Sequence, residues 1–481
     1  MISQDLMAPI MFGGLIVFLL IGYPAAFSLG AVGLFFSFIG IEMGMFQPTF
    51  LQALPDRVFG ILSNDLLLSI PFFTFMGAIL EKCGLAEDML EGLGQLFGPI
   101  RGGLAYAVII VGAILGAITG TVAASVIAMG LISLPIMLRY GYNPRVATGV
   151  IAASGTITQL IPPSLVLIVL ADQLGKSVGD MYAGAIGPSI IQIILFCLFI
   201  FFLSIFRPQD VPALPPEARP KIDWKLFKKI LWGIVPSIAL IFLVLGTILM
   251  GLATPTEGGA MGSVGALVLA AMNGRLQKTL VWDAMTSTMR INAMVIFILI
   301  GSTVFGLAFR GVDGDLWIEH LLSGLPGGQV GFLIVVNLFV FFLAFFLDYF
   351  EIAFIIIPLL APVAQKLGID LIWFGVLLGA NMQTSFMHPP FGFALFYLRG
   401  VAPKSVKSSD IYYGALPWVG LQLILVAIII FVPETVTYFI DKPAIAVDAN
   451  AISVDPLAGV EQNEITVDSS SEIERQLREN K

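Results

Sequence analysis

Charged residues are scarce in this chain, and so are the residue types that build metal or disulfide frameworks. Only 12% of its 481 residues are charged, and it contains two cysteines and two histidines. Cys83 and Cys197 are too few for a disulfide scaffold or a cysteine-based metal site. The sequence therefore predicts no transition-metal centre, and no basic patch points to nucleic-acid binding.

Complete catalytic motifs are missing as well. Gly175-Lys176-Ser177 resembles the end of a phosphate-binding loop, but Leu170 occupies the position of the required first glycine. Residues 311–315 resemble the GxGD motif of intramembrane aspartyl proteases, but the spacing differs. We therefore expect no ATPase, and we predict that the chain is not an enzyme.

What the chain has in abundance is apolar sequence, at 58% of all residues. A soluble fold could not bury so much, and many windows approach the roughly 20 apolar residues that span a bilayer. We predict an all-α polytopic membrane protein. Because no Lys or Arg precedes the first apolar run, that run is expected to be a retained span and not a cleaved signal peptide. The predicted spans and arms are residues 8–22, 25–41, 58–80, 104–118, 122–138, 146–171, 181–206, 230–250, 254–272, 284–309, 332–347, 352–365, 371–397 and 415–439, with an interfacial segment at 85–97.

The few charges predict which side each loop faces. Residues 207–229 carry six Lys or Arg against three acids, and five prolines, which indicates a cytoplasmic linker under the positive-inside rule. Arg101 precedes the arms at 104–138 and Arg139 and Arg145 follow them, so both ends of this unit are expected to be cytoplasmic. A unit that begins and ends on one side is a re-entrant hairpin. Residues 440–481, with nine acids and four bases, are predicted to form a largely disordered tail.

The stretch at 112–164 is broken twice, at 116–125 and at 154–164, by Gly, Pro, Ser and Thr. Exposed backbone is costly in hydrocarbon, so broken helices persist where they are buried in protein or line a wet cavity. Both breaks recur later in the chain at an offset of 227 residues, at 343–352 and 381–391. With the second hairpin entering from outside, this is an inverted repeat. The nine identities that support the offset pair Leu80, Gly84, Pro99, Pro135, Gly141, Ala153, Pro162, Pro163 and Gly187 with Leu307, Gly311, Pro326, Pro362, Gly368, Ala380, Pro389, Pro390 and Gly414.

Each polar feature has a structural interpretation beside the functional one. The structural interpretation of the Ser and Thr in the breaks is a kinked helix whose hydroxyls bond to its own carbonyls, whereas the paired occurrence of the breaks favours an oxygen-rich Na⁺ site. Asp348 and Glu351, the only charges within residues 341–360, are either a structural pair or part of a site. Gly112 and Gly116 suit helix packing, whereas Gly120 suits a tight turn at a hairpin tip. His388 lies beside the second Pro-Pro pair and could contact the site, but the structural interpretation is favoured for it.

Two long motifs carry a family resemblance. They are GAITGTVAASVIAMGLISLPIMLRYGYNPRVATGVIAASGTITQLIPPS at 116–164 and FFLDYFEIAFIIIPLLAPVAQKLGIDLIWFGVLLGANMQTSFMHPPFGFALFYLRGVAP at 345–403. They resemble the large membrane (M) subunit, the DctM-like family, of tripartite ATP-independent periplasmic (TRAP) transporters, over roughly residues 6–433. The resemblance implies a Na⁺-coupled importer of carboxylates, with an elevator fold like that of the ion transporter superfamily. The second motif is similar to a branch paired with receptors for 2-oxo monocarboxylates.

The resemblance also implies partners and sites. The partners are a small four-helix membrane subunit, a periplasmic substrate-binding protein, the carboxylate and the lipids of a bacterial inner membrane, with Na⁺ as coupling ion and no cofactor. The implied first Na⁺ site comprises Thr119, Gly120, Thr121, Ser125, Ser154, Gly155, Thr156, Thr158 and Pro162. The implied second site comprises Asp348, Glu351, Asn381, Gln383, Thr384, Ser385 and Pro389. Glu351 departs from the apolar residue usual in the family. The residues expected to line the substrate are Ser154, Gln159, Asn381, Gln383 and His388.

The domain organisation follows from the repeat. Residues 1–206 form the first half, with a hairpin at 104–138 and a broken helix at 146–171, and 207–229 form the linker. Residues 230–439 form the second half, with a hairpin at 332–365 and a broken helix at 371–397, and 440–481 form the tail. Three rivals remain: an intramembrane enzyme built on Asp348 and Glu351, a stand-alone ion-coupled symporter or exporter of a related elevator family, and a structural scaffold.

Overall fold

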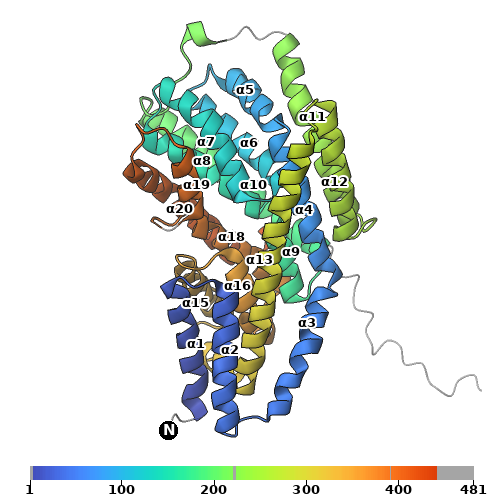
Figure 1. The fold of residues 1–481 in the computed structure, drawn as a ribbon. Coiled ribbons are helices and arrows are strands. Elements are labelled where there is room, and N and C mark those ends of the chain that lie inside the picture. Colours follow the sequence, from blue (N-terminus) through green and yellow to red (C-terminus); the bar gives the residue numbers. More distant parts are fainter. Residues whose placement is uncertain (1–3, 220–223, 391, 441–481) are drawn as a thin grey trace, which may run out of the picture. The chain divides into compact units, whose positions relative to one another are not determined.

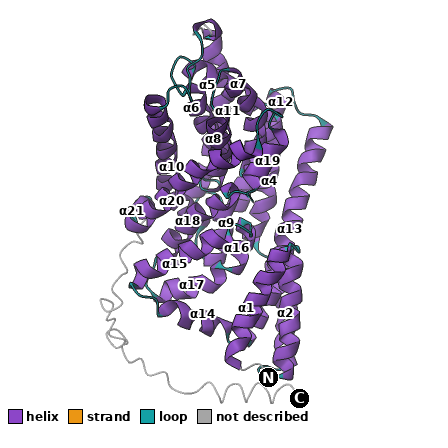
Figure 2. Ribbon diagram, turned by 90° about the vertical axis from the view of Figure 1, so that its left-hand side faces the viewer, coloured by secondary structure: helices purple, strands orange, loops and turns teal. Residues whose placement is uncertain are grey.

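The computed structural model describes residues 4–219, 224–390 and 392–440, so the predicted tail, apart from Ile440, lies outside the described residues. Over these ranges every regular element is helical and none is a strand (Figure 2). The first half contains α1 (Gln4–Ile21), α2 (Ala25–Glu42), η1 (Pro48–Ala53), α3 (Leu54–Leu62), α4 (Asp65–Lys82), α5 (Leu85–Phe97), α6 (Gly103–Thr119), α7 (Val122–Arg139), α8 (Pro144–Thr156), η2 (Ile157–Gln159), α9 (Leu165–Leu174) and α10 (Val178–Phe206).

The second half begins after the linker and is coloured from yellow-green to red in Figure 1; its helices follow in the same order as their counterparts in the first half. The linker contains η3 (Pro216–Ala218). The second half contains α11 (Trp224–Leu249), α12 (Pro255–Met272), α13 (Lys278–Gly311), α14 (Gly314–Ser323), α15 (Gly328–Leu343), α16 (Tyr349–Ile355), α17 (Ile357–Lys366), α18 (Leu371–Met382), η4 (Gln383–Met387), α19 (Phe393–Val401), α20 (Ser408–Phe431) and α21 (Glu434–Thr437).

Helix length and composition agree with a polytopic membrane protein. Among the described residues six helices are long and apolar enough to cross a bilayer, or up to nine if each bent pair counts as one span. The predicted offset of 227 residues also appears in the helix bounds. The helix after the first tip begins at Val122 and its counterpart at Tyr349, and the broken helices begin at Pro144 and Leu371. The assignment of two inverted halves across a membrane stays a prediction.

In the first hairpin, formed by α6 and α7, the start of α6 lies beside the end of α7. Residues 104–108 of α6 and 132–137 of α7 line one small cavity against α5, so the start of one arm lies beside the end of the other. Both ends also bind the segment after α10. The amide of Gly102 donates to the carbonyl of Val211, and the amide of Asn143 donates to the carbonyl of Asp210, both at 3.0 Å. The two ends of the hairpin and the linker therefore lie on one side of the fold.

The second hairpin, α15 with α16 and α17, closes in the same way. The side-chain amide of Gln329, at the start of α15, donates to the carbonyl of Leu367 just after α17, at 2.7 Å. Its second arm is not one helix, as predicted, but two helices bent by 53° at Ile356. Pro358 lies in the first turn of α17, where its missing N–H and fixed φ suit a new helix start.

Two other predicted spans were also wrong, one in its continuity and one in its bounds. The span at 58–80 is divided between α3 and α4, with a 46° bend. Asn64 causes the second helix to begin afresh, because its side chain accepts a hydrogen bond from the amide of Leu66 at 2.9 Å. The last span, 415–439, begins earlier, at Ser408, and stops at Phe431 before Pro433. Both predicted broken helices are confirmed, between α8 and α9 and between α18 and α19.

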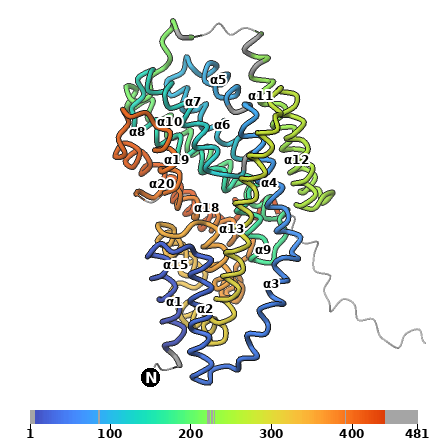
Figure 3. The backbone as a smooth tube through the Cα atoms, in the orientation of Figure 1, coloured from blue at the N-terminus to red at the C-terminus, as the bar shows by residue number. Residues whose placement is uncertain are grey.

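Segments far apart in sequence form the core. One hydrophobic cluster joins the first hairpin and α8 to α19 and α20, and another joins α9 to the second hairpin and α18. Figure 3 shows α19 and α20 beside α7 and α8. Gly149 and Gly414 permit the α8–α20 contact, since a Cβ on Gly149 would lie 2.2 Å from the carbonyl oxygen of Gly414. Each half of the chain is therefore packed against the broken helix of the other.

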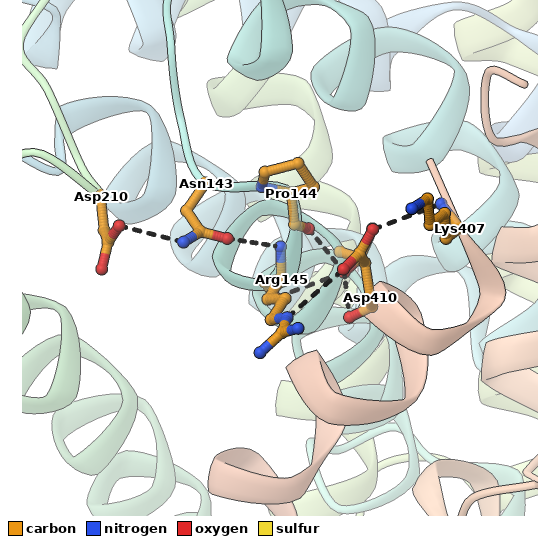
Figure 4. A network of polar contacts seen from close by, with 7 residues as sticks. Asn143, Pro144, Arg145, Asp210, Lys407 and Asp410 are labelled. Atoms are coloured by element: carbon orange, nitrogen blue, oxygen red, sulfur yellow. Dashed lines mark hydrogen bonds and ion pairs between the residues drawn. The ribbon is translucent and has the colours of Figure 1, made fainter. Parts of the chain in front are cut away.

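A polar network fixes the α8–α20 pair to the linker (Figure 4). Asn143 caps α8 by accepting from the amide of Arg145 and donates to Asp210, both at 3.0 Å. The Arg145 guanidinium pairs with Asp410 of α20 at 3.3 Å, and the other oxygen of that carboxylate accepts from the amide of Lys407. The linker, the start of α8 and the start of α20 therefore meet at one place.

Candidate functional site

The first broken helix ends in a short, fully buried polar segment. Ser154, Thr156 and Thr158 are 0% exposed and Gln159 is 2% exposed. α8 gives way to the 3₁₀ turn η2 after Thr156, and α9 begins only after Pro162-Pro163, whose peptide bond is cis. Backbone polar groups are thus released from regular helix pairing inside the protein, as a transport site in a broken helix requires.

Several hydroxyls of this segment back-bond, as the structural interpretation proposed. Thr156 donates to the carbonyl of Ala153 at 2.9 Å, Thr158 to Gly155 at 3.0 Å, and Ser164 to Gln159 at 2.5 Å. The Ser154 hydroxyl and both amide atoms of Gln159, however, are buried without a hydrogen-bond partner. Buried polar atoms of native proteins are nearly always paired, so these unpaired atoms are candidates for contact with a bound group.

The tip of the first hairpin is held against this segment by glycines. A Cβ on Gly112 would lie 2.6 Å from the Cβ of Ser154, and one on Gly116 would lie 2.9 Å from the Cα of Thr158. Gly120 has φ +60° at the turn between α6 and α7, which confirms the predicted tight turn. Gly155 touches α7, since a Cβ added to it would lie 2.2 Å from the side chain of Val126. The structure therefore brings the tip and the first break together.

The remaining residues predicted for the first site have mixed environments. Ser125 is fully buried and Thr121 is half-buried, and both make contacts within the protein. The side chain of Thr119 lies outside the described residues. Pro162 precedes Pro163, which lines a small apolar cavity with Ala117 of α6.

The second break repeats this arrangement. Gln383 and Thr384 are 0% exposed, Asn381 is 1% and Ser385 is 5%. Thr384 and Ser385 back-bond to the carbonyls of Asn381 and Met382, at 2.8 and 2.6 Å. The Pro389-Pro390 peptide bond is cis. One atom of each amide here, Oδ1 of Asn381 and Nε2 of Gln383, is buried without a partner.

Asn337 links this break to the second hairpin. The side-chain amide of Asn381 donates to the backbone carbonyl of Asn337 at 2.8 Å and to its side-chain oxygen at 3.1 Å. Asn337 lies on α15 within an apolar arm, and the sequence interpretation did not single it out. A lone amide in an apolar span was the signal that could have found it.

Asp348 and Glu351 form a capping box at the start of α16. The amide of Glu351 donates to Oδ1 of Asp348 at 2.9 Å, and the amide of Asp348 donates to Oε2 of Glu351 at 3.0 Å. This reciprocal pair satisfies two amides that a helix start leaves unpaired, so the pair has the structural role considered above. One oxygen of each carboxylate remains outside the box. No group of three or more His, Cys, Asp or Glu side chains that could hold a metal occurs among the described residues.

His388 packs among aromatic rings. His388 is 1% exposed, with its ring between those of Phe341 and Phe345 at centroid distances of 4.4 and 4.0 Å. This aromatic packing favours the structural interpretation of His388. Near the carboxylates, Tyr349 joins the start of α16 to the second break through a ring contact of 6.1 Å with Phe386.

Two glutamines that the sequence interpretation missed contact the breaks from other helices. Gln192 of α10 donates to Oε1 of Gln383 at 2.6 Å, and Gln422 of α20 donates to the hydroxyl of Thr156 at 3.0 Å. Each contact joins one half of the chain to the broken helix of the other. Three separate buried amide contacts therefore hold the two breaks, and none of the three involves a carboxylate.

A cavity of about 670 Å³ lies elsewhere, between α3, α13 and the second arm of the second hairpin. Arg57, Arg310 and Asn64 line it, and Asn64 donates to Asp172 there at 2.6 Å. None of the residues predicted for the ion sites lines this cavity.

Comparisons with known proteins agree on one family. A family model described as the tripartite ATP-independent periplasmic transporter, DctM component, matches residues 12–435. A C4-dicarboxylate TRAP transporter large permease protein of Rhodobacter capsulatus is 29% identical, over 89% of this chain and 97% of its own length. The sialic acid TRAP transporter permease protein of Haemophilus influenzae is 24% identical, over 87% of this chain and 66% of its own length.

The fold has a solved relative. The Alcanivorax borkumensis YdaH transporter, described as having an unusual topology, aligns with a TM-score of 0.56 over 79% of this chain and 86% of its own, at 16% identity. Identity this low supports the likeness of fold alone.

Proposed function

Because the chain belongs to the DctM component family of tripartite ATP-independent periplasmic transporters, we propose that it imports organic acids by coupling their uptake to a Na⁺ gradient. Membership of the family makes it a multi-pass protein of the bacterial inner membrane and the large permease of a secondary, ATP-independent transporter. The observation that carries the finer proposal is the pair of buried, polar helix breaks, each held against a hairpin.

The breaks supply the ligand type that Na⁺ prefers. We assign the first site to the break at Ser154–Thr158 with the hairpin tip, and the second to the break at Asn381–Ser385 with Asp348 and Glu351 at the other tip. Carbonyl, hydroxyl and amide oxygens suit a hard cation, and broken helices release carbonyls for this purpose. The carboxylate oxygens that the capping box leaves over would add charge to the second site.

Amide N–H groups offer a way to bind a carboxylate without an arginine. Nε2 of Gln383 and the amide of Gln159 are buried and donate to no protein group. The relatives are named for C4-dicarboxylate, isethionate and sialic acid transport. We propose a small organic acid as the substrate class for this chain, and 2-oxo monocarboxylates as the first compounds to test.

The proposal includes two partners and a mechanism. A periplasmic binding protein would deliver the substrate, and a small membrane subunit would complete the transporter. In an elevator, the hairpins and broken helices would move together as one body. Packing supports this for one part of the assembly, because the first hairpin, α8, α19 and α20 share one hydrophobic cluster.

Uptake into proteoliposomes tests the proposal. The chain and its small membrane subunit would be reconstituted, supplied with the loaded binding protein, and given an inward Na⁺ gradient or an equal K⁺ gradient. We expect accumulation of labelled carboxylate only with Na⁺, and loss of accumulation when Na⁺ is equal on both sides. Equal uptake in Na⁺ and K⁺ would refute the coupling, and uptake without the binding protein would favour a stand-alone symporter.

A further inference from the structure

The two glutamines that reach the breaks are placed alike in the two halves of the chain. Gln192 lies on α10 and Gln422 on α20, the last long helix of each half, and both side chains are 0% exposed. Each donates its amide to a residue where a broken helix leaves regular geometry. Gln422 reaches Thr156, the last residue of α8, and Gln192 reaches Gln383, the first residue of η4.

The acceptors occupy equivalent positions under the internal repeat. Thr156 and Gln383 are separated by 227 residues (383 − 156 = 227), the offset that relates the two halves. The donors act crosswise, because the helix of the first half reaches the break of the second and the helix of the second reaches the break of the first. Close packing supports both contacts, through Gly149 and Gly414 for α8 with α20, and through Gly375 and Met181 for α18 with α10.

The hydrogen bonds act on residues at the points where regular helix geometry ends. A residue that has left the helix ladder is fixed only by its remaining contacts, and a buried amide has no water with which to exchange its bond. Oε1 of Gln192 and Oε1 of Gln422 are buried without partners beside the segments they contact. Each glutamine therefore fixes one break by its N–H and presents an oxygen next to it.

We infer that Gln192 and Gln422 are positioning residues, which hold the two breaks in the conformation that binds the coupling ion. The inference rests on the proposed function, since it assigns these residues to the proposed ion sites. It adds that each site is completed by the opposite half of the chain. Loss of either glutamine hydrogen bond would let the contacted break relax, so a higher Na⁺ concentration would be needed to order it.

The test uses the complete reconstituted transporter and variants Gln422→Met and Gln192→Met, which keep side-chain length and remove both polar atoms. We expect the Na⁺ concentration that half-saturates uptake to rise about threefold to tenfold, the factor expected for one lost buried hydrogen bond. Gln95→Met, on α5, removes an amide that bonds Glu91 of its own helix, and it serves as the matched control.

The outcomes separate this inference from the function on which it rests. Na⁺-dependent wild-type uptake with unchanged half-saturation in both Met variants would overturn the inference and leave the function intact. A fall in maximal rate alone, with half-saturation unchanged, would also overturn it, because a merely structural role predicts that result. Wild-type uptake that does not depend on Na⁺ would contradict both this inference and the proposed function. If a Met variant does not fold, Gln422→Asn or Gln192→Asn keeps a polar amide on a shorter side chain and serves as the second variant, with the same expected rise.

Discussion

At the scale of single residues, the absence of a side chain matters as much as its presence. Gly116 lets α6 lie against the first break, where an added Cβ would approach the Cα of Thr158 to 2.9 Å. Real Cβ atoms do not come so near to backbone, so α6 would have to move away. The glycines predicted to serve packing therefore also set the distance between the hairpin and the proposed ion site.

Gly116→Ala is expected to destabilise the protein by about 1–3 kcal/mol, the usual cost of overpacking a tight contact. Thermal unfolding in detergent measures this, and the uptake rate should fall with it. Gly30→Ala is the control, because Gly30 also lies inside a helix but has nothing within 4 Å of the added Cβ. Equal melting temperatures for the two variants would show that the α6 contact is looser than this.

Asp348 allows its capping role to be separated from its charge. Asparagine caps a helix about as well as aspartate, so Asp348→Asn should change the unfolding free energy by less than about 1 kcal/mol. It removes a negative charge from the proposed second site, and the half-saturating Na⁺ concentration is expected to rise about tenfold. Asp348→Ala should lose the cap as well, about 1 kcal/mol of stability. A normal Na⁺ response in Asp348→Asn would assign this carboxylate to capping alone.

At the scale of elements, capping outweighs ion pairing at the meeting point of the linker, α8 and α20. Asn143→Ala should cost about 0.5–2 kcal/mol, because Asn143 both caps α8 and bonds Asp210. Arg145→Gln removes an ion pair whose side chains are 56% and 21% exposed, and such pairs are worth about 0.2–1 kcal/mol. Melting temperatures should therefore fall further for Asn143→Ala. The reverse order would mean that the pair with Asp410 is better shielded than its exposure indicates.

Helix breaks were predictable where glycine, proline and hydroxyl residues cluster, as they do before Pro162-Pro163 and Pro389-Pro390. The breaks at Asn64 and Ile356 were missed, because each lies in an apolar run whose composition still allows a continuous span. Backbone geometry there depends on a single cap or on one proline in a first turn. Periodicity and hydropathy do not resolve features of that size.

The candidate site was predictable in its breaks but not in its connections. The partners of Gln192, Gln422 and Asn381 are 191, 266 and 44 residues distant in sequence. An amide in an apolar helix indicates that a partner exists, but which partner depends on tertiary packing. The pair Asp348 and Glu351 shows the converse, since its three-residue spacing is that of a capping box and could have been recognised from sequence.

At the scale of the whole molecule, large apolar side chains cover much of the surface that the structure describes. Phe35 and Phe38 of α2 and Phe242 of α11 are 61%, 65% and 73% exposed. In water such surfaces would drive association, whereas acyl chains or a partner helix cover them without cost. This exposure accords with the inner-membrane location but does not indicate which loops face the cytoplasm.

The charge distribution predicts which side of the membrane each loop faces, and cysteine labelling can test that prediction. With Cys83 and Cys197 replaced by alanine, one cysteine would be introduced at Glu217 in the linker or at Ser323 at the end of α14, both of which are exposed. In intact spheroplasts a membrane-impermeant maleimide should label Ser323→Cys and not Glu217→Cys. After permeabilisation both should react. The reason is that the basic linker is retained in the cytoplasm, while the turn before the second hairpin faces outward.

The same experiment decides whether the hairpins enter from opposite sides. Both ends of the first hairpin bind the segment at Asp210 and Val211, so the linker reports its side. The second hairpin begins at Gly328, five residues beyond Ser323 in the chain, so Ser323 reports its side. Labelling of both cysteines, or of neither, in intact spheroplasts would place the two hairpins on one side, and the inverted repeat would then be wrong. An inverted pair requires that one of the two cysteines reacts and the other does not, and the charge distribution predicts that Ser323→Cys is the one that reacts.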